Sequence, residues 1–142
     1  KVSEPAAAEV ILPVCSALSF LHARGRIFRD LKLENLVFRK TPQQLWTITL
    51  IDFGLCLKVD RGPTLLHKCK GTPYTSAPEC FETPAVIDEK CDAWSVGVVL
   101  HLLVTGKRPF DAKTLEDLQA QVRQPLTAPA EVSRECWGLI RR

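Results

Sequence analysis

Charged and amide side chains interrupt an otherwise apolar segment, RIFRDLKLENLVF, at residues 26–38. Three of them, Asp30, Lys32 and Asn35, could do chemistry together, and Asp52 follows the apolar run WTITLI in the sequence IDFG. If a hairpin joins the two segments, one ammonium, one amide and two carboxylates surround a single space. The spacing therefore favours a polar site over a solvated turn of no consequence.

The residue types favour phosphoryl transfer. Two carboxylates alone would also suit the acid and base chemistry of a glycosidase. A lysine beside a carboxylate suits a negatively charged transferred group, and the oxygens of Asn35 and Asp52 are ligands that Mg²⁺ prefers. We expect a carboxylate that orients a hydroxyl, a lysine that neutralises charge and two oxygen ligands for a metal.

A first helix is predicted to begin after Ser3 and to end at Gly25. Ser3 is a candidate N-cap, and glycine commonly follows the end of a helix. Apolar residues recur at helical spacing between the two. Pro13 lies inside this pattern, so we expect a kink or a break there.

The segment DEKCDAWSVGVVLHLLVTG, residues 88–106, predicts the strongest helix. Its middle is apolar nearly all round, which indicates a central buried helix that ends at Gly106. An amphipathic surface helix is predicted from Thr114, and a last helix from about Ala130. The apolar face of that last helix should consist of Val132, Cys136, Leu139 and Ile140.

Three short apolar pieces, RIF, NLVF and WTITLI, predict strands, and RKTPQQ at residues 39–44 predicts a hairpin connection. The sequence from Gly54 to about Pro84 lacks periodicity and predicts a long loop, which in a compact domain is usually functional or disordered. The predicted fold class is mainly α with a small β-hairpin region, that is, α+β.

Length and composition indicate one globular domain. The 142 residues suffice for a core without disulfides, and a net charge of +3 is too small to indicate nucleic acid or an anionic membrane as a partner. No apolar run is expected to approach the roughly 20 residues of a membrane span. The six cysteines form no C-x-x-C pair, so we expect inert thiols, no zinc and a cytoplasmic protein. Both ends look cut, because the chain starts with Lys1 and contains no Met.

Four motifs in order, FRDLKLEN, DFG, GTPYTSAPE and DAWSVG, resemble the signatures of the C-terminal lobe of eukaryotic protein kinases. The resemblance covers the whole chain. It implies the C-terminal helical lobe of the protein-kinase-like fold, with residues 1–142 as a partial kinase domain that lacks the N-terminal lobe and the end of the C-terminal lobe. It also implies a serine/threonine kinase that uses ATP and Mg²⁺ and acts on protein substrates.

The resemblance also implies roles for single residues. Asp30 matches the catalytic aspartate that orients the substrate hydroxyl, and Lys32 matches the lysine that contacts the γ-phosphate in Ser/Thr-type enzymes. Asn35 and Asp52 match the two metal-binding positions. Thr72 matches the hydroxyl that ties the substrate-docking segment to the catalytic aspartate and lysine.

Other matched positions concern the nucleotide and the scaffold. Val37 corresponds to the floor of the adenine pocket. Glu79 matches a structural glutamate whose usual arginine partner would follow the end of this chain, and Asp92 matches the buried aspartate that anchors the catalytic loop. Phe28 replaces the more usual histidine and is expected to stack with Phe53.

Regulation is less determined. Lys68 stands where many kinases have a phosphorylatable residue, while Arg29, which would pair with that phosphate, is present. The switch is therefore absent or uses Thr64. DEKCDAWSVGVVL and LVTGKRPFD resemble the calcium/calmodulin-dependent group, including calcium-dependent protein kinases, which implies a calcium-sensing region outside this chain. A pseudokinase or scaffold without phosphotransfer is the alternative.

Overall fold

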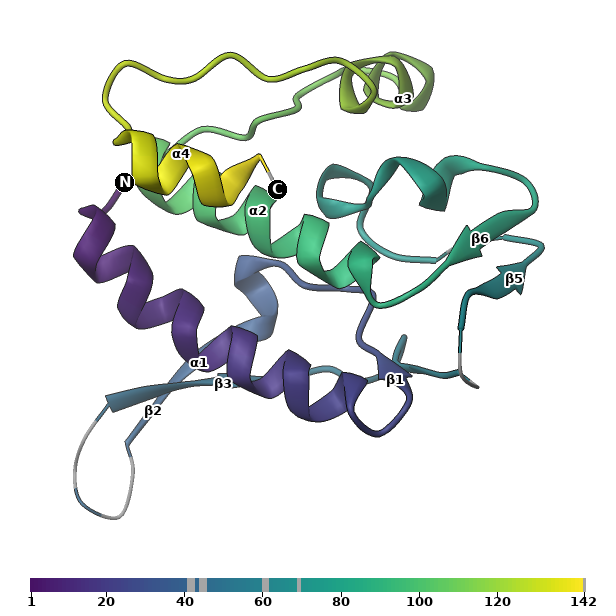
Figure 1. The fold of residues 1–142 in the computed structure, drawn as a ribbon, viewed down its shortest axis with the longest axis horizontal. Helices are drawn as coiled ribbons and strands as arrows, with labels where there is room; N and C mark the ends of the chain where they lie inside the picture. Colours follow the sequence, from purple (N-terminus) through teal and green to yellow (C-terminus); the bar gives the residue numbers. More distant parts are fainter. Residues whose placement is uncertain (41–42, 44–45, 60–61, 69, 142) are drawn as a thin grey trace.

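The computed structural model describes residues 1–40, 43, 46–59, 62–68 and 70–141. Over these residues the chain forms four α-helices and three two-stranded antiparallel sheets (Figure 1). The helices are α1 (Glu4–His22), α2 (Lys90–Thr105), α3 (Leu115–Val122) and α4 (Arg134–Ile140). The paired strands are β1 (Arg26–Ile27) with β4 (Leu57–Lys58), β2 (Leu36–Lys40) with β3 (Trp46–Leu50), and β5 (Thr64–Leu66) with β6 (Ala85–Ile87). This architecture confirms the predicted α+β class.

Helix α1 begins where the sequence predicts. The Ser3 hydroxyl accepts a hydrogen bond from the backbone N–H of Ala6 at 3.4 Å. The helix then runs without interruption through Pro13 to His22, so the break considered there does not occur. Proline removes one helical hydrogen bond, but the helix packs on the core on both sides of it, and such packing supplies most helical stability. The buried residues are Ala7, Ile11, Val14 and Leu18.

By length and composition alone, α1 could cross a membrane. It has 19 residues and a mean hydropathy of 1.4 over an 18-residue window. This corrects the expectation that no apolar run approaches the roughly 20 residues of a span. In the fold, its buried stripe packs against α2 and β3, as in the core helix of a globular domain. The absence of a membrane partner stays a prediction.

Gly25 allows the chain to turn from α1 into β1. Its φ is +62°, a left-handed conformation that favours glycine. Its carbonyl accepts a hydrogen bond from the N–H of Val59 at 2.8 Å, and a Cβ at this position would lie 2.7 Å from the Val59 oxygen. Glycine is therefore required for β4 to approach β1.

Helix α2 is the central element, as predicted, and it contacts both α1 and α4 (Figure 1). It ends at Gly106, which has a φ of +74° and donates its N–H to the Leu102 carbonyl. Most of its residues are buried, among them the polar Asp92, Ser95 and His101. The helix thus carries polar groups into the middle of the domain.

Helix α4 is shorter than predicted and begins at Arg134 rather than near Ala130. Its N-cap is Ser133, whose N–H and hydroxyl both donate to the Glu4 carboxylate at 2.8 Å. Cys136 is buried, but Leu139 is 63% exposed, so the prediction that Leu139 faces the core is wrong. Cys136 and Ile140, four residues apart, are the residues of this helix that pack on the main core.

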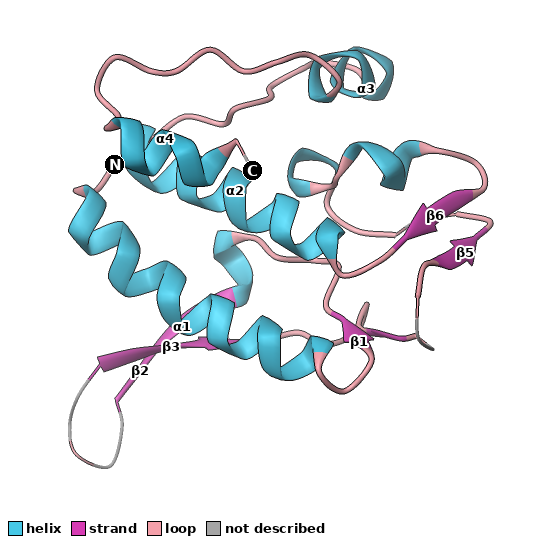
Figure 2. Ribbon diagram, viewed as in Figure 1, coloured by secondary structure: helices cyan, strands magenta, loops and turns pink. Residues whose placement is uncertain are grey.

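The segment from Gly54 to Pro84 is more ordered than the long loop that its sequence predicts. It contains β4, β5 and two 3₁₀ turns, Pro73–Thr75 and Pro78–Phe81 (Figure 2). Each strand has two or three residues and pairs with a distant part of the chain, which local periodicity cannot indicate. The β2–β3 hairpin is confirmed. Of its predicted connection at residues 39–44, Arg39 and Lys40 belong to β2 instead, and residues 41, 42 and 44 lie outside the described residues.

Candidate active site

The β2–β3 hairpin brings the two predicted polar segments together. Leu36 of β2 is opposite Leu50 of β3, and the Ile51 N–H donates to the Asn35 carbonyl at 2.9 Å. Asp52, the next residue, therefore leaves the sheet beside the 3₁₀ turn Leu33–Asn35. The hairpin predicted from the sequence thus sets these residues at one end of the same two strands.

The carboxylate of Asp30 is the centre of a hydrogen-bond network. Its Oδ2 accepts from Lys32 Nζ at 2.8 Å and from Asn35 Nδ2 at 3.1 Å. Its Oδ1 accepts from the Thr72 hydroxyl at 2.7 Å and the Thr72 N–H at 3.0 Å. Lys32 Nζ also donates to Thr72 Oγ1 at 3.0 Å. Of the four predicted catalytic residues, Lys32, Asn35 and Thr72 therefore each contact Asp30 directly.

Burial and hydrogen bonding act in opposite directions on this network. Burial of the nearly inaccessible Asp30 carboxylate would by itself raise its pKa, but the hydrogen bonds from Lys32 and Thr72, the Lys32 charge and the Asn35 amide together lower it. The hydrogen bond to Asp30 raises the pKa of Lys32, burial opposes this, and the charges of Asp30, Glu34 and Asp52 raise the pKa further. Both groups therefore carry charge at neutral pH.

Asn35 and Asp52 fit a hard divalent cation. Asn35 Nδ2 donates to the Asp30 carbonyl at 2.9 Å as well as to its carboxylate, so the amide oxygen faces away from Asp30. The exposed Asp52 side chain accepts a hydrogen bond on Oδ1 from the Gly54 N–H at 3.1 Å, and Oδ2 accepts none from the described residues. Among the described residues, no three His, Cys, Asp or Glu side chains cluster as metal ligands. Two protein oxygens suit Mg²⁺, which completes its shell with water and phosphate oxygens.

Backbone strain is concentrated at the same place. Arg29 has a φ of +71° and Asp52 a φ of +63°, and they are the two non-glycine residues with positive φ in the described part of the chain. Arg29 is held by its N–H to Asp92 Oδ1 at 2.7 Å and by its Nε to the Leu55 carbonyl at 2.9 Å. Conformations of this kind cost about 1–3 kcal/mol each and tend to cluster at functional sites.

A fully buried carboxylate on α2 holds the loop before Asp30. Asp92 Oδ2 accepts from the Phe28 N–H at 2.8 Å, and the Asp92 side chain has no exposed surface. His22 Nε2, at the end of α1, lies 2.8 Å from the same oxygen. The sequence indicated Asp92 but not His22, because 70 residues separate the two and no local pattern connects them. Three elements therefore meet at one carboxylate.

Phe28 occupies an apolar position beneath the site. It is fully buried, and its ring meets the Phe53 ring edge to face with the centroids 5.3 Å apart. The predicted contact between these residues is confirmed. Val37 is half-buried on the hairpin face opposite to the core-packed Leu36, and its role as the floor of a nucleotide pocket stays a prediction.

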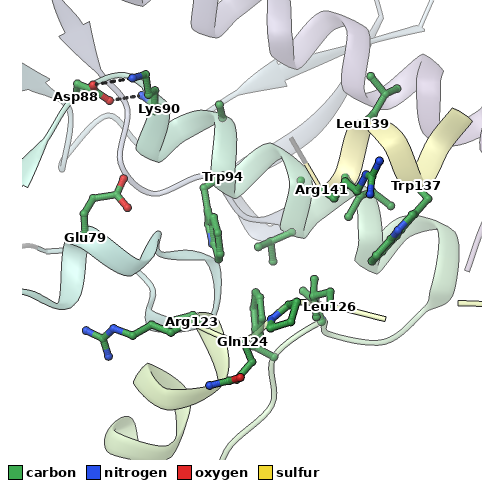
Figure 3. Close-up of a pocket in the computed structure, with 18 of the residues that line it drawn as sticks. Glu79, Asp88, Lys90, Trp94, Arg123, Gln124, Leu126, Trp137, Leu139 and Arg141 are labelled. Carbon is green, nitrogen blue, oxygen red and sulfur yellow. Dashed lines mark hydrogen bonds and ion pairs between the residues drawn. The ribbon is translucent and has the colours of Figure 1, made fainter. Parts of the chain in front are cut away.

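A separate groove of about 1000 Å³ is lined in part by residues of α2 and α4 (Figure 3). None of Asp30, Lys32, Asn35 or Thr72 lines it. The Trp94 indole N–H is buried with no hydrogen-bond partner among the described residues, and Glu79, at one end, has no ion-pair partner among them. Its apolar lining includes Trp94, Phe110, Leu126, Trp137 and Ile140.

Comparison with known proteins identifies the family of the chain. The family model for the protein kinase domain matches residues 1–142, so the chain belongs to the protein kinase domain family.

The similar proteins are all named as protein kinases, and several of them are named as serine/threonine kinases. Protein kinase kin1 of Schizosaccharomyces pombe is 37% identical over 143 residues, which cover 100% of this chain and 16% of the relative. The serine/threonine-protein kinase SIK3 homolog of Danio rerio is 37% identical over 142 residues, 99% of this chain and 12% of the relative. CBL-interacting protein kinase 4 of Oryza sativa subsp. japonica is 34% identical over 145 residues, 100% of this chain and 31% of the relative. The chain thus spans less than a third of each relative, and the calcium/calmodulin-dependent subgroup stays a prediction.

Proposed function

We propose that the chain is the C-terminal lobe of a serine/threonine protein kinase, which in its intact form transfers the γ-phosphoryl group of Mg-ATP to protein hydroxyls. The observation that carries the proposal is the contact of Thr72 with both Asp30 and Lys32. The Lys32 ammonium and the Thr72 N–H and hydroxyl all donate to the Asp30 carboxylate, which supports a substrate-docking role for the segment that contains Thr72. The names of the relatives support the serine/threonine type.

Asp30 is suited to receive the substrate hydroxyl. Its lowered pKa keeps it ionised, so it can accept the hydroxyl hydrogen bond and then take up the proton as the oxygen attacks phosphorus. It already accepts four hydrogen bonds, about as many as a carboxylate can accept. The substrate hydroxyl must therefore replace one donor, and Lys32 is the donor that a phosphate would attract.

Asn35 and Asp52 would hold Mg²⁺ with their side-chain oxygens, and bound Mg²⁺ would supply charge neutralisation to the phosphates. Lys32, whose ammonium lies next to the Asp30 carboxylate, would add a positive charge near the transferred phosphate. Val37 would contact the adenine. The remaining nucleotide contacts would come from an N-terminal lobe. We therefore expect this chain alone to bind ATP in the millimolar range, about −4 kcal/mol, and not to catalyse.

The groove beside α2 supports the assignment as a partial domain. Among the described residues the buried Trp94 indole N–H has no hydrogen-bond partner and Glu79 has no ion-pair partner, and further residues of the lobe would satisfy both groups. A calcium-sensing region outside this chain and a cytoplasmic location stay predictions.

The test is Asp52→Ala in the full-length protein, assayed for transfer of labelled phosphate to a mixture of protein substrates. Phosphotransfer should be lost, while Asp111→Ala, which removes an exposed carboxylate far along the chain, should retain it. Retained activity in Asp52→Ala would refute the assignment. No transfer by the unsubstituted protein would favour the pseudokinase or scaffold.

A further inference from the structure

Two aromatic side chains are exposed at the outer end of the β2–β3 hairpin. Phe38 is 69% exposed and Trp46 is 66% exposed. Their rings meet edge to face with the centroids 6.5 Å apart, so they form a single apolar surface. Globular domains seldom place two adjacent aromatic rings in water unless the surface binds something.

This surface continues the core-facing side of the hairpin. Leu50 is buried, and Leu36 and Ile48 pack against the main core. Phe38 is opposite Ile48, and because side chains alternate between the two faces of a strand, Phe38 and Trp46 lie on the same face as these core residues. The hairpin end projects beyond α1, which covers only its inner part (Figure 1). The apolar stripe therefore extends from the core to the end of the hairpin, where its side chains are exposed.

The charge of the hairpin has one sign. Lys40 is opposite Trp46, and its Nζ lies 5.3 Å from the Trp46 ring centroid. Arg39 is the adjacent exposed residue, and residues 36–50 contain no Asp or Glu, which gives the segment a formal charge of +2. Lysine on a strand at the edge of a sheet is a common protection against aggregation. That explanation accounts for the charge but not for the two exposed aromatic rings beside it.

We propose that Phe38, Lys40 and Trp46 form a docking surface for an acidic polypeptide segment that carries an aromatic or large aliphatic side chain. The apolar side chain packs on the two rings, and an acidic side chain pairs with Lys40. Charge complementarity selects this occupant over a second copy of the chain, whose identical positive hairpin would be repelled. The docking surface lies at the opposite end of the hairpin from Asn35, so it functions independently of phosphotransfer.

The test is fluorescence anisotropy of labelled peptides with the full-length protein. An acidic peptide with one tryptophan, its lysine-substituted version and its tryptophan-to-serine version are compared. We expect only the first to bind. Trp46→Ser and Lys40→Glu should each weaken that binding about tenfold, as expected for central contacts of a small interface.

Matched variants on other surfaces serve as controls. Leu12→Ser removes a side chain that is also 66% exposed, and Lys113→Glu reverses an exposed charge on another loop. Both should leave the affinity unchanged, and circular dichroism should show every variant folded. Equal binding of the lysine-substituted peptide, or equal loss in the controls, overturns the proposal. Binding of single-stranded DNA or phosphatidylserine vesicles that depends on Trp46 and Lys40, with no acidic peptide bound, overturns it also.

Discussion

The hydroxyl of Thr72 lies between the carboxylate of Asp30 and the ammonium of Lys32. It donates to Asp30 Oδ1 at 2.7 Å and accepts from Lys32 Nζ at 3.0 Å, although 40 residues separate Thr72 from Lys32. The Thr72 N–H adds a second bond to the same oxygen. The segment after Gly71 is thus fixed to the charge pair by one residue.

Thr72→Val should lower activity in the intact kinase, whereas Thr72→Ser should largely retain it. Valine keeps the shape but removes both roles of the hydroxyl, and a hydrogen bond to a charged group is worth about 1.5–3 kcal/mol, or about ten- to a hundredfold in kcat/KM. The measurement is steady-state phosphotransfer to a peptide. Thr127→Val, at an exposed position, is the control. Equal activities of the valine and serine variants would contradict a role for the hydroxyl.

The Asp30–Lys32 pair should contribute to stability between about pH 4 and pH 10. Because the folded pKa of Asp30 is lowered, its contribution is present above its unfolded pKa and is lost as the pH falls through the folded value. Because the folded pKa of Lys32 is raised, its contribution is present below its unfolded pKa and is lost as the pH rises through the folded value.

Urea denaturation of the chain and of the Asp30→Asn, Lys32→Met double variant, from pH 3 to pH 11, measures this contribution. The difference in free energy of unfolding should be level in the middle of the range and smaller at both ends. The Asp88–Lys90 pair, with a lysine side chain that is 82% exposed, serves as the control and should show little such dependence. If the difference in free energy of unfolding does not vary with pH, the Asp30–Lys32 ion pair does not contribute to stability in this way.

The elements with local signals could be predicted from the sequence. Helix α2 is apolar nearly all round at its centre, and it ends at Gly106. Helix α3 starts after Thr114, whose hydroxyl accepts a hydrogen bond from the Asp117 N–H at 3.1 Å. Caps and periodicity act within a few residues, so they are visible in the sequence itself. The same holds for the β2–β3 hairpin, whose strands are near in sequence.

Features that depend on distant contacts could not be predicted in this way. The contact of β1 with β4 joins two-residue strands, and His22 meets Asp92 across 70 residues. The residues of the candidate site stand out in the sequence because they match a family pattern. The residue types alone suggested phosphoryl transfer but did not bring Thr72 to Asp30. Physical proximity across the chain is a property of the whole fold, which a local pattern does not contain.

Pro13→Ala should stabilise the chain. Alanine restores the N–H that α1 lacks at this position and is better suited to a helix interior by up to about 3 kcal/mol. The loss of proline also gives the unfolded chain more freedom, which offsets part of the gain, so we expect about 1–2 kcal/mol. Chemical denaturation measures it. Ser16→Ala, on the exposed side of the same helix, should change little, and a destabilised Pro13→Ala would show that the helix requires the proline geometry.

Asp92→Asn should destabilise the chain by about 3 kcal/mol, because the site is fully buried and is surrounded by donors. The two carboxylate oxygens accept from the Phe28 and Arg29 N–H groups and lie beside His22 Nε2, so the NH₂ of asparagine must face at least one donor. Urea denaturation gives the loss of stability. Hydrogen exchange gives its location, since the amides of residues 28 and 29 should lose more protection than the rest of the core.

Asp88→Asn, next to the start of the same helix, should cost less than about 1 kcal/mol, because its carboxylate is in contact with solvent. If exchange at residues 28 and 29 is unchanged while global stability falls, Asp92 supports the core in general and does not hold the catalytic loop.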